Sequence, residues 1–309
     1  MGVIRYFQQF FNRNGLLLST LLLGAVGFWI VFLIVLPQVF MLDFSFRFNL
    51  PPAELGGPKD VYTLSNYEFL MFGSPNNPEP LNVVDLSVFL RTLLAAVFVT
   101  LFDLMLCYPI AFYLAKSAQG GYARLMVLSL IVPFWVNEIL RAFAFRILFG
   151  STGIINAFLI WIGVLSEPMD FIQADIALYA GLGYAYILLM IFPLYNAIES
   201  LDTNQIEAAR DMGAPWWRIH WRVVIPFAKP GITSGCTMVF MLSAGALAAP
   251  QILGGPSSLW FTQIIYQWFN TGGNWPRGSA YAIVLLVTCI AFVLLIMRLF
   301  KVKLGAIGR

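Results

Sequence analysis

The sequence predicts an all-α integral membrane protein with six transmembrane helices. Of its 309 residues, 60% are hydrophobic and only 11% are charged. A bilayer core about 30 Å thick requires about 20 consecutive apolar residues in a helix. Six stretches reach that length, at 16–42, 92–115, 125–149, 176–198, 231–250 and 278–297. We therefore expect a single transmembrane domain over residues 1–309.

This composition excludes several protein classes. Soluble chains are about 45–50% apolar and about 25% charged, because their surface must carry charge. A net charge of +3 without a dense basic run argues against nucleic-acid binding. His220 is the only histidine, so a metal site built on several histidines is excluded. The three cysteines lie inside apolar runs, where they are expected to be small buried hydrophobic residues.

The first apolar stretch is a membrane anchor by its length. It is about twice as long as the apolar core of a signal peptide, and no A-x-A cleavage site follows it. A seventh apolar run, 152–165, is too short to span, so we expect a helix at the membrane surface.

The distribution of Lys and Arg predicts the orientation, because cytoplasmic loops carry the excess of these residues. With the N-terminus inside, the cytoplasmic set is Arg5, Arg13, Lys116, Arg124, Arg210, Arg218, Arg222, Lys229, Arg298, Lys301, Lys303 and Arg309. The exterior set is Arg47, Lys59, Arg91 and Arg277. Both termini are therefore expected in the cytoplasm. The long exterior loop at 43–91, which contains six prolines, is a possible docking surface for an external partner.

A cytoplasmic loop at 199–225 contains the most informative motif. Asp202 is suited to cap a helix, with Gln205 completing a capping box. Ile206, Ala209 and Met212 recur every three residues and form one apolar face. Gly213 suits the left-handed position that ends the helix, and Pro215 suits the first turn of a second, tryptophan-rich helix.

A short helix of this kind is suited to enter a groove on another protein. Ala208 and Ala209 are small enough for close approach, while Glu207 and Asp211 offer charge to basic residues of a partner.

The loop resembles the EAA loop of binding-protein-dependent ABC importer permeases. Glu207-Ala208-Ala209 is followed after three residues by Gly213, and after nine more by Val223 with Ile225-Pro226. The resemblance implies the type I importer (MetI-like) permease fold in a bacterial inner membrane. It also implies that the loop is a coupling helix, in which Glu207 meets a basic residue of an ATPase subunit and Gly213 gives the turn.

The resemblance also implies the partners. They are two ATP-binding cassette subunits, a second homologous permease subunit and a periplasmic solute-binding protein, and the sequence leaves open whether the permease pair is a hetero- or homodimer. The sequence contains no Gly-x-x-x-x-Gly-Lys-Ser/Thr motif, so ATP is expected to bind the partner subunits. We expect no cofactor and no enzymatic activity in this chain.

Further stretches resemble the spermidine/putrescine branch of these permeases. They are 108–112, 131–141, 150–156, 188–202, 250–256 and 274–276. One departure concerns the fifth span, where members of that branch often carry an acid and this chain has the neutral Ala246 and Gln251. The small residues at 243–250 indicate a close-packed or pore-lining helix that breaks near Pro250.

Ionisable residues inside a membrane are expensive and therefore mark possible functional sites. Glu138 and Arg141, three residues apart on one helix, are predicted to pair. Asp103 is predicted either to meet an Arg of the third span or to line the solute path. The path candidates, which offer charge, aromatic faces for ammonium groups or an amide, are Asp103, Trp135, Glu138, Arg141, Tyr184, Tyr186 and Gln251.

The favoured function is inward transport of a polyamine as a permease subunit of an ABC importer. A zwitterionic amino-acid-like solute or an anion is an alternative, because of Arg141 and the neutral fifth span. A secondary carrier, with Asp103 and Glu138 binding a coupling ion, is less favoured, because no inverted repeat is visible.

Overall fold

The described residues form helices joined by turns and loops, and they contain no strand apart from one isolated bridge between Arg47 and Tyr62. The structure is a computed structural model that describes residues 11, 15–54, 56–74, 81–117, 120–256 and 258–302. Six segments of the described chain are long and apolar enough to cross a membrane, which confirms the predicted number. They are Leu16–Ser45, Val83–Lys116, Glu138–Trp161, Ile176–Glu199, Trp216–Ala244 and Trp275–Phe300.

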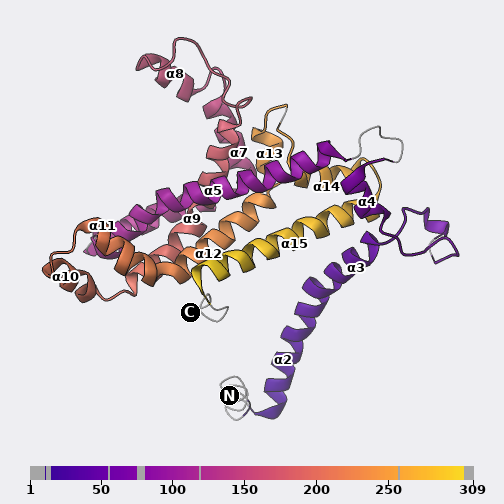
Figure 1. The fold of residues 1–309 in the computed structure, drawn as a ribbon, viewed down its shortest axis with the longest axis horizontal. Coiled ribbons are helices and arrows are strands. Elements are labelled where there is room, and N and C mark those ends of the chain that lie inside the picture. Colours follow the sequence, from indigo (N-terminus) through magenta and orange to yellow (C-terminus); the bar gives the residue numbers. More distant parts are fainter. Residues whose placement is uncertain are drawn as a thin grey trace.

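Three helices form the centre of the bundle. Helix α9 (Ile176–Glu199) packs against both α5 (Val83–Lys116) and α12 (Ile225–Ala244), and α15 (Trp275–Phe300) covers α12 (Figure 1). Small residues permit the close contact of α9 and α12. A Cβ added at Gly231 would lie 2.3 Å from the Pro193 carbonyl oxygen, so only glycine fits there.

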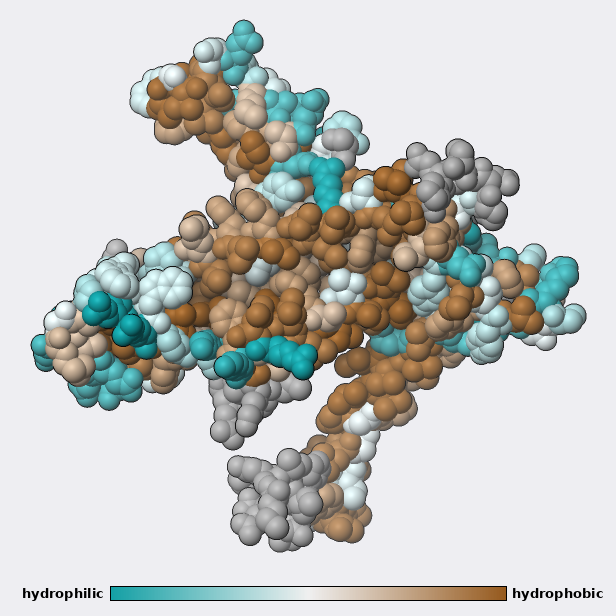
Figure 2. Space-filling view, in the orientation of Figure 1, coloured by the Kyte–Doolittle hydropathy of each residue, from teal (hydrophilic) through white to brown (hydrophobic). Residues whose placement is uncertain are grey.

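The first span leaves the bundle. It comprises α2 (Leu16–Ile30), the π-helical segment Val31–Val35 and α3 (Leu36–Ser45), and only α3 packs on α15. Figure 1 shows α2 extending away from the other helices, and Figure 2 shows its surface as almost entirely hydrophobic. Its side chains are exposed because no other described part of the chain covers them.

The prediction of one helix over 125–149 is wrong. The structure has α6 (Gly120–Ile131), a 3-10 turn at Val132–Trp135 and a new helix α7 (Glu138–Phe149). Pro133 lacks the N–H that would continue the ladder. The Asn137 side chain then caps α7 by accepting from the Ile139 N–H at 2.8 Å.

The seventh apolar run, expected as a surface helix over 152–165, contains the separate helix α8 (Ile154–Trp161). It follows α7 after a turn and lies away from the centre of the bundle in Figure 1. By length and composition, however, α7 and α8 together make up the third possible span.

The fifth span also differs from the prediction. It begins at Trp216, where α11 (Trp216–Ile219) and a π-helical segment (His220–Val224) run directly into α12. The helix breaks at residues 245–247 and not at Pro250. Pro250 lies in the first turn of α13 (Ala248–Leu253), where backbone N–H groups have no helical acceptor, so the missing N–H costs no hydrogen bond.

The described part of the loop between the first two spans is held by Arg47. Its guanidinium donates to Asp43 and Asp60, each at 2.7 Å, so it joins the end of α3 to the loop. Asn66 of α4 (Ser65–Phe72) donates to the carbonyls of Ser45 and Arg47 at 3.0 and 2.8 Å. Helix α14 (Phe261–Asn270) lies at the same end of the bundle (Figure 1).

Candidate functional site

The first candidate site is α10 (Thr203–Asp211) with the turn that follows it, at the opposite end of the bundle from α4 (Figure 1). Asp202 caps the helix as predicted, accepting from the Asn204 N–H at 3.0 Å. This bond reaches the second helical residue rather than the third, so the cap is not the predicted capping box.

Gly213 has the left-handed conformation that was predicted, with φ of 76°. The Gly213 N–H donates to the Arg210 carbonyl at 2.9 Å, and the Ala214 N–H donates to the Ala209 carbonyl at 3.1 Å. This pair of bonds is a Schellman motif, which satisfies the last carbonyls of α10 and reverses the chain. Pro215 lies just before α11, one position earlier than expected.

The two faces of α10 differ in what they contact. Ile206 and Ala209 are buried and belong to the hydrophobic core. Ala209 therefore faces its own chain and is not available for close approach by a partner, contrary to prediction. Met212 is 81% exposed, because it is the C-terminal cap and has left the helical face.

The exposed face of α10 carries Glu207, Ala208 and Asp211. Neither carboxylate forms a salt bridge or a side-chain hydrogen bond within the described residues. Two charges and a small residue are thus presented together to the outside.

Helix α5 anchors this loop at both ends. The Lys116 ammonium donates to the carbonyls of Glu199 and Leu201, where α9 ends and the loop begins. The Tyr108 hydroxyl is hydrogen-bonded to His220 Nδ1 at 2.7 Å, where the fifth span begins. Sequence reasoning missed both anchors, since the partners are 83–112 residues apart.

The second group comprises the predicted path residues. The structure brings Glu138 and Arg141 near the buried Tyr186 hydroxyl. The predicted Glu138–Arg141 ion pair is absent from the salt bridges of the described residues. Arg141 instead donates to the Ala185 carbonyl at 3.4 Å, and its Nε has no partner there.

Asp103 meets neither of the alternatives predicted for it. It pairs with no arginine in the described chain, and it is 1% exposed, so it does not line an open path. Both carboxyl oxygens are buried between α5 and α9 without a hydrogen-bond partner among the described residues. A Cβ added at Gly183 would lie 2.9 Å from Asp103 Oδ1, which shows how tightly the two helices enclose it.

The remaining path residues do not join this group. Trp135 is 85% exposed, and Gln251 is exposed on α13. The Tyr184 ring packs on Phe145 of α7 with ring centroids 5.1 Å apart. Arg146, also intramembrane in the sequence, donates to the Ile252 carbonyl and so links α7 to α13.

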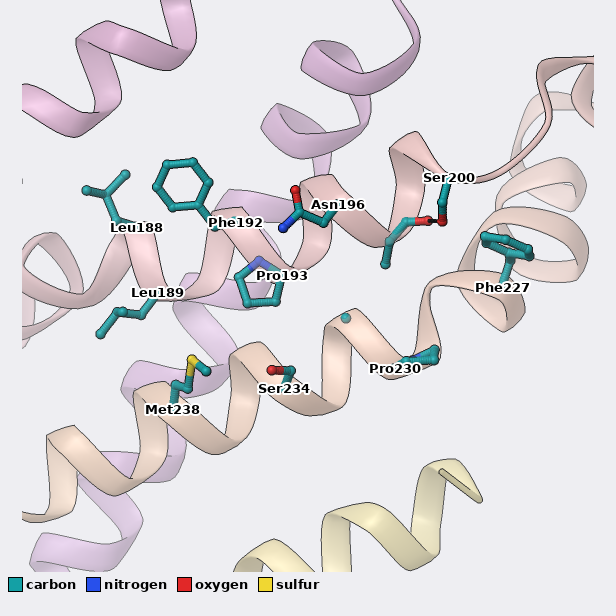
Figure 3. Close-up of a pocket in the computed structure, with 12 residues that line it drawn as sticks. Leu188, Leu189, Phe192, Pro193, Asn196, Ser200, Phe227, Pro230, Ser234 and Met238 are labelled. Carbon is teal, nitrogen blue, oxygen red and sulfur yellow. Dashed lines mark hydrogen bonds between the residues drawn. The ribbon is translucent and has the colours of Figure 1, made fainter. Parts of the chain in front are cut away.

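A pocket of about 840 Å³ lies between α9 and α12. Figure 3 shows Pro193 and Asn196 on α9 and Pro230, Ser234 and Met238 on α12 around it. Sequence reasoning missed this pocket, although Pro193, inside the predicted span 176–198, is a signal of irregular backbone.

Comparison with known proteins decides the family. Residues 86–302 match the description "Binding-protein-dependent transport system inner membrane component". This chain belongs to that family. The match begins in α5, so the first span lies outside it.

Several members of the family are similar over most of this permease. The chain is 34% identical to the spermidine/putrescine permease PotB of Escherichia coli K12, over 84% of this chain and 89% of the relative. The Haemophilus influenzae PotB is also 34% identical, over 84% of this chain and 86% of the relative. The Escherichia coli inner membrane permease YdcU is 29% identical, over 94% and 92%.

The fold is that of ABC importer permeases. A crystal structure of a bacterial ABC transporter for alginate import has a chain that matches with a TM-score of 0.70 at 18% identity, covering 96% of this chain and 98% of that one. The predictions of the family, the MetI-like fold and a permease subunit of an ABC importer are therefore confirmed. The permease is a multi-pass inner membrane protein.

Proposed function

We propose that this permease moves a polyamine, spermidine or putrescine, inward from a periplasmic binding protein. The observation that carries the proposal is the 34% identity to spermidine/putrescine permeases over 84% of the chain. The intramembrane carboxylate of Glu138 also favours a cationic solute, since ammonium groups bind carboxylates.

The assembly that supports this transport contains a second permease subunit and two ATPase subunits. We place α10 on the cytoplasmic side, where Glu207 and Asp211 meet basic residues of an ATPase subunit. Both termini are then cytoplasmic, in agreement with the excess of Lys and Arg on that side. ATP binds to the ATPase subunits, and this chain transmits their motion through α10 to α9 and α12.

In this proposal, movement of the loop is transmitted to the bundle through the hydrogen bonds at its two ends. Because Lys116 and Tyr108 hold its two ends on α5, a displacement of α10 reaches α5, α9 and α12 together. The packed core that includes Ile206 and Ala209 resists independent movement of the loop.

The test is uptake by the whole complex in proteoliposomes. Labelled spermidine or putrescine, delivered with the binding protein, should accumulate inside when ATP is present on the cytoplasmic face. The purified chain without its partners should hydrolyse no ATP. Hydrolysis by the isolated chain would contradict the proposed division of labour.

A solute that carries a carboxylate is the second possibility. It is favoured by Arg141, whose Nε has no partner among the described residues, and by the neutral Ala246 and Gln251. The same uptake assay decides, with a zwitterionic amino acid as competitor. Uptake that ignores polyamines but is blocked by the zwitterion would favour this alternative and leave the permease assignment unchanged.

A further inference from the structure

The pocket between α9 and α12 combines irregular backbone with few polar side chains. Pro193 lies inside α9 and Pro230 inside α12, and proline has no N–H to donate. The carbonyls four residues earlier, those of Leu189 and Pro226, therefore lack their ordinary helical donor. Figure 3 shows Pro193 pointing from α9 toward α12, so this irregular backbone faces the pocket.

Ser234 supplies an unused polar group at the same place. Its side chain is only 7% exposed, and its hydroxyl makes no hydrogen bond within the described residues. Asn196, across the pocket on α9, is exposed, and its side-chain amide makes no hydrogen bond in that part of the chain. The Ser234 hydroxyl is part of the pocket wall and has no partner among the described residues, so it is free to accept a hydrogen bond from a ligand in the pocket.

The other walls of the pocket suit an alkyl chain. Leu188, Leu189 and Met238 are apolar, and Phe192 and Phe227 contribute aromatic rings. The lining residues carry no charge. An apolar helix from another subunit or a lipid chain would leave the Ser234 hydroxyl without a partner, which is unfavourable in a dry interface.

We propose that this pocket is a transient site for the ammonium end of an alkylamine as it passes through the permease. The ammonium donates to the oxygens of Ser234 and Asn196 and to the free carbonyls, and the aromatic rings add cation–π attraction. The alkyl chain lies on the apolar walls. The inference rests on the proposed polyamine function and assigns a place to the solute within it.

Neutral oxygen ligands explain how such a site releases its ligand. A transport path requires binding that is strong enough for entry and weak enough for departure. Neutral oxygens and aromatic faces meet this requirement, whereas a buried carboxylate would hold an ammonium ion much more strongly.

The first experiment compares uptake by the complex with the double variant Ser234→Ala/Asn196→Ala. Loss of hydrogen bonds to a charged ligand should reduce putrescine uptake at low concentration about ten-fold. Solute-independent ATP hydrolysis should not change. The control is Thr233→Val, which removes one hydroxyl at a buried neighbour outside the pocket and should retain normal uptake.

The second experiment detects occupancy directly. In Ser234→Cys, a methanethiosulfonate reagent should modify the introduced thiol, and putrescine should slow that modification several-fold, while a neutral diol of the same length should not. Normal uptake in the double variant, or modification indifferent to putrescine, overturns the site but leaves the polyamine function intact. If the unaltered complex moves no polyamine, both proposals are wrong.

Discussion

The hydroxyl of Tyr108 and Nδ1 of His220 are 2.7 Å apart, and their hydrogen bond joins α5 to the first turns of the fifth span. His220 is also packed against the rings of Phe112 and Trp216, at centroid distances of 4.4 and 4.3 Å. The segment that begins at His220 is π-helical, an irregularity often found at functional sites. The only histidine of the chain thus connects the loop to the bundle through a hydrogen bond and ring packing.

Replacement of Tyr108 by Phe should destabilise the contact between α5 and His220. The change leaves a buried imidazole nitrogen without a partner, which costs about 1–3 kcal/mol. We expect a lower melting temperature of the purified complex and weaker solute-stimulated ATP hydrolysis. The control is Tyr113→Phe on the same helix, where the ring is 45% exposed and its hydroxyl makes no hydrogen bond within the described chain. Equal melting temperatures for the two variants would contradict a role for the bond.

Gly213→Val should impair coupling through backbone strain alone. Apart from Gly213 and its two chain neighbours, no atom lies within 4 Å of an added Cβ, so contacts with the rest of the described chain play no part. A non-glycine residue in the left-handed region costs about 1–2 kcal/mol, and a β-branched one more. We expect reduced transport, whereas Gly213→Asn, which tolerates this conformation, should retain most of it. If the valine variant transports at the normal rate, the Schellman turn is not needed for coupling.

Glu207→Lys should weaken the binding of the ATPase subunits. The side chain is exposed and unpaired in the described chain, so the permease itself should insert and fold normally. Reversal of the charge places like charges together in the proposed interface, and the loss should be greatest at low salt. Pull-down of the ATPase subunit with the tagged permease measures it. Glu207→Gln should show an intermediate effect. Equal recovery of the ATPase subunit with Glu, Gln and Lys at position 207 would refute the docking role.

Asp103→Asn should leave the melting temperature unchanged or raise it. An amide replaces a carboxyl of the same shape, and no cation of the described chain loses its partner. Thermal unfolding of the assembled complex is the measurement, with Gly183→Ala as the comparison that should lower stability because its Cβ would approach Asp103 Oδ1 to 2.9 Å. Strong destabilisation by Asp103→Asn would contradict this account.

The loop between the first two spans should lose order in acid. The Gly56 N–H and the Arg47 guanidinium both hold the pKa of Asp60 below its usual range. A carboxyl whose pKa is lowered by folding contributes stability above its unfolded pKa of about 3.9 and loses it as the pH falls through the lower folded value. Proteolysis of the loop in the complex should therefore be slow at neutral pH and increase below about pH 4. Asp60→Asn should be cleaved faster at neutral pH, and an unchanged rate would contradict this account.

The sequence was sufficient where local chemistry decides the structure. Hydrophobic length gave the number of spans, and the spacing from Asp202 to Gly213 predicted a capped helix with a left-handed end. The same reasoning failed where partners are distant in the chain. Arg141 donates to the Ala185 carbonyl of α9 rather than pairing with Glu138 of its own helix. Helical periodicity in the sequence does not predict such a contact with a distant helix.

Helix ends were the other source of error. The apolar periodicity of α10 extended to Met212, but the Schellman turn removes that residue from the helical face. Pro250 was expected to break the fifth span, yet the chain breaks at 245–247, which leaves this proline in a first turn where it is harmless. Periodicity identifies a face but does not locate the residue at which the face ends.

The separation of α2 from the bundle has a consequence for how the polypeptide is assembled. This helix satisfies its own backbone bonds while most of its side chains face outward, so the bilayer alone is enough to keep it helical. Insertion and docking are then distinct events for this segment, because α3 packs on α15, which lies much later in the sequence. The packing of this span on the bundle can therefore form only after α15 has also been made.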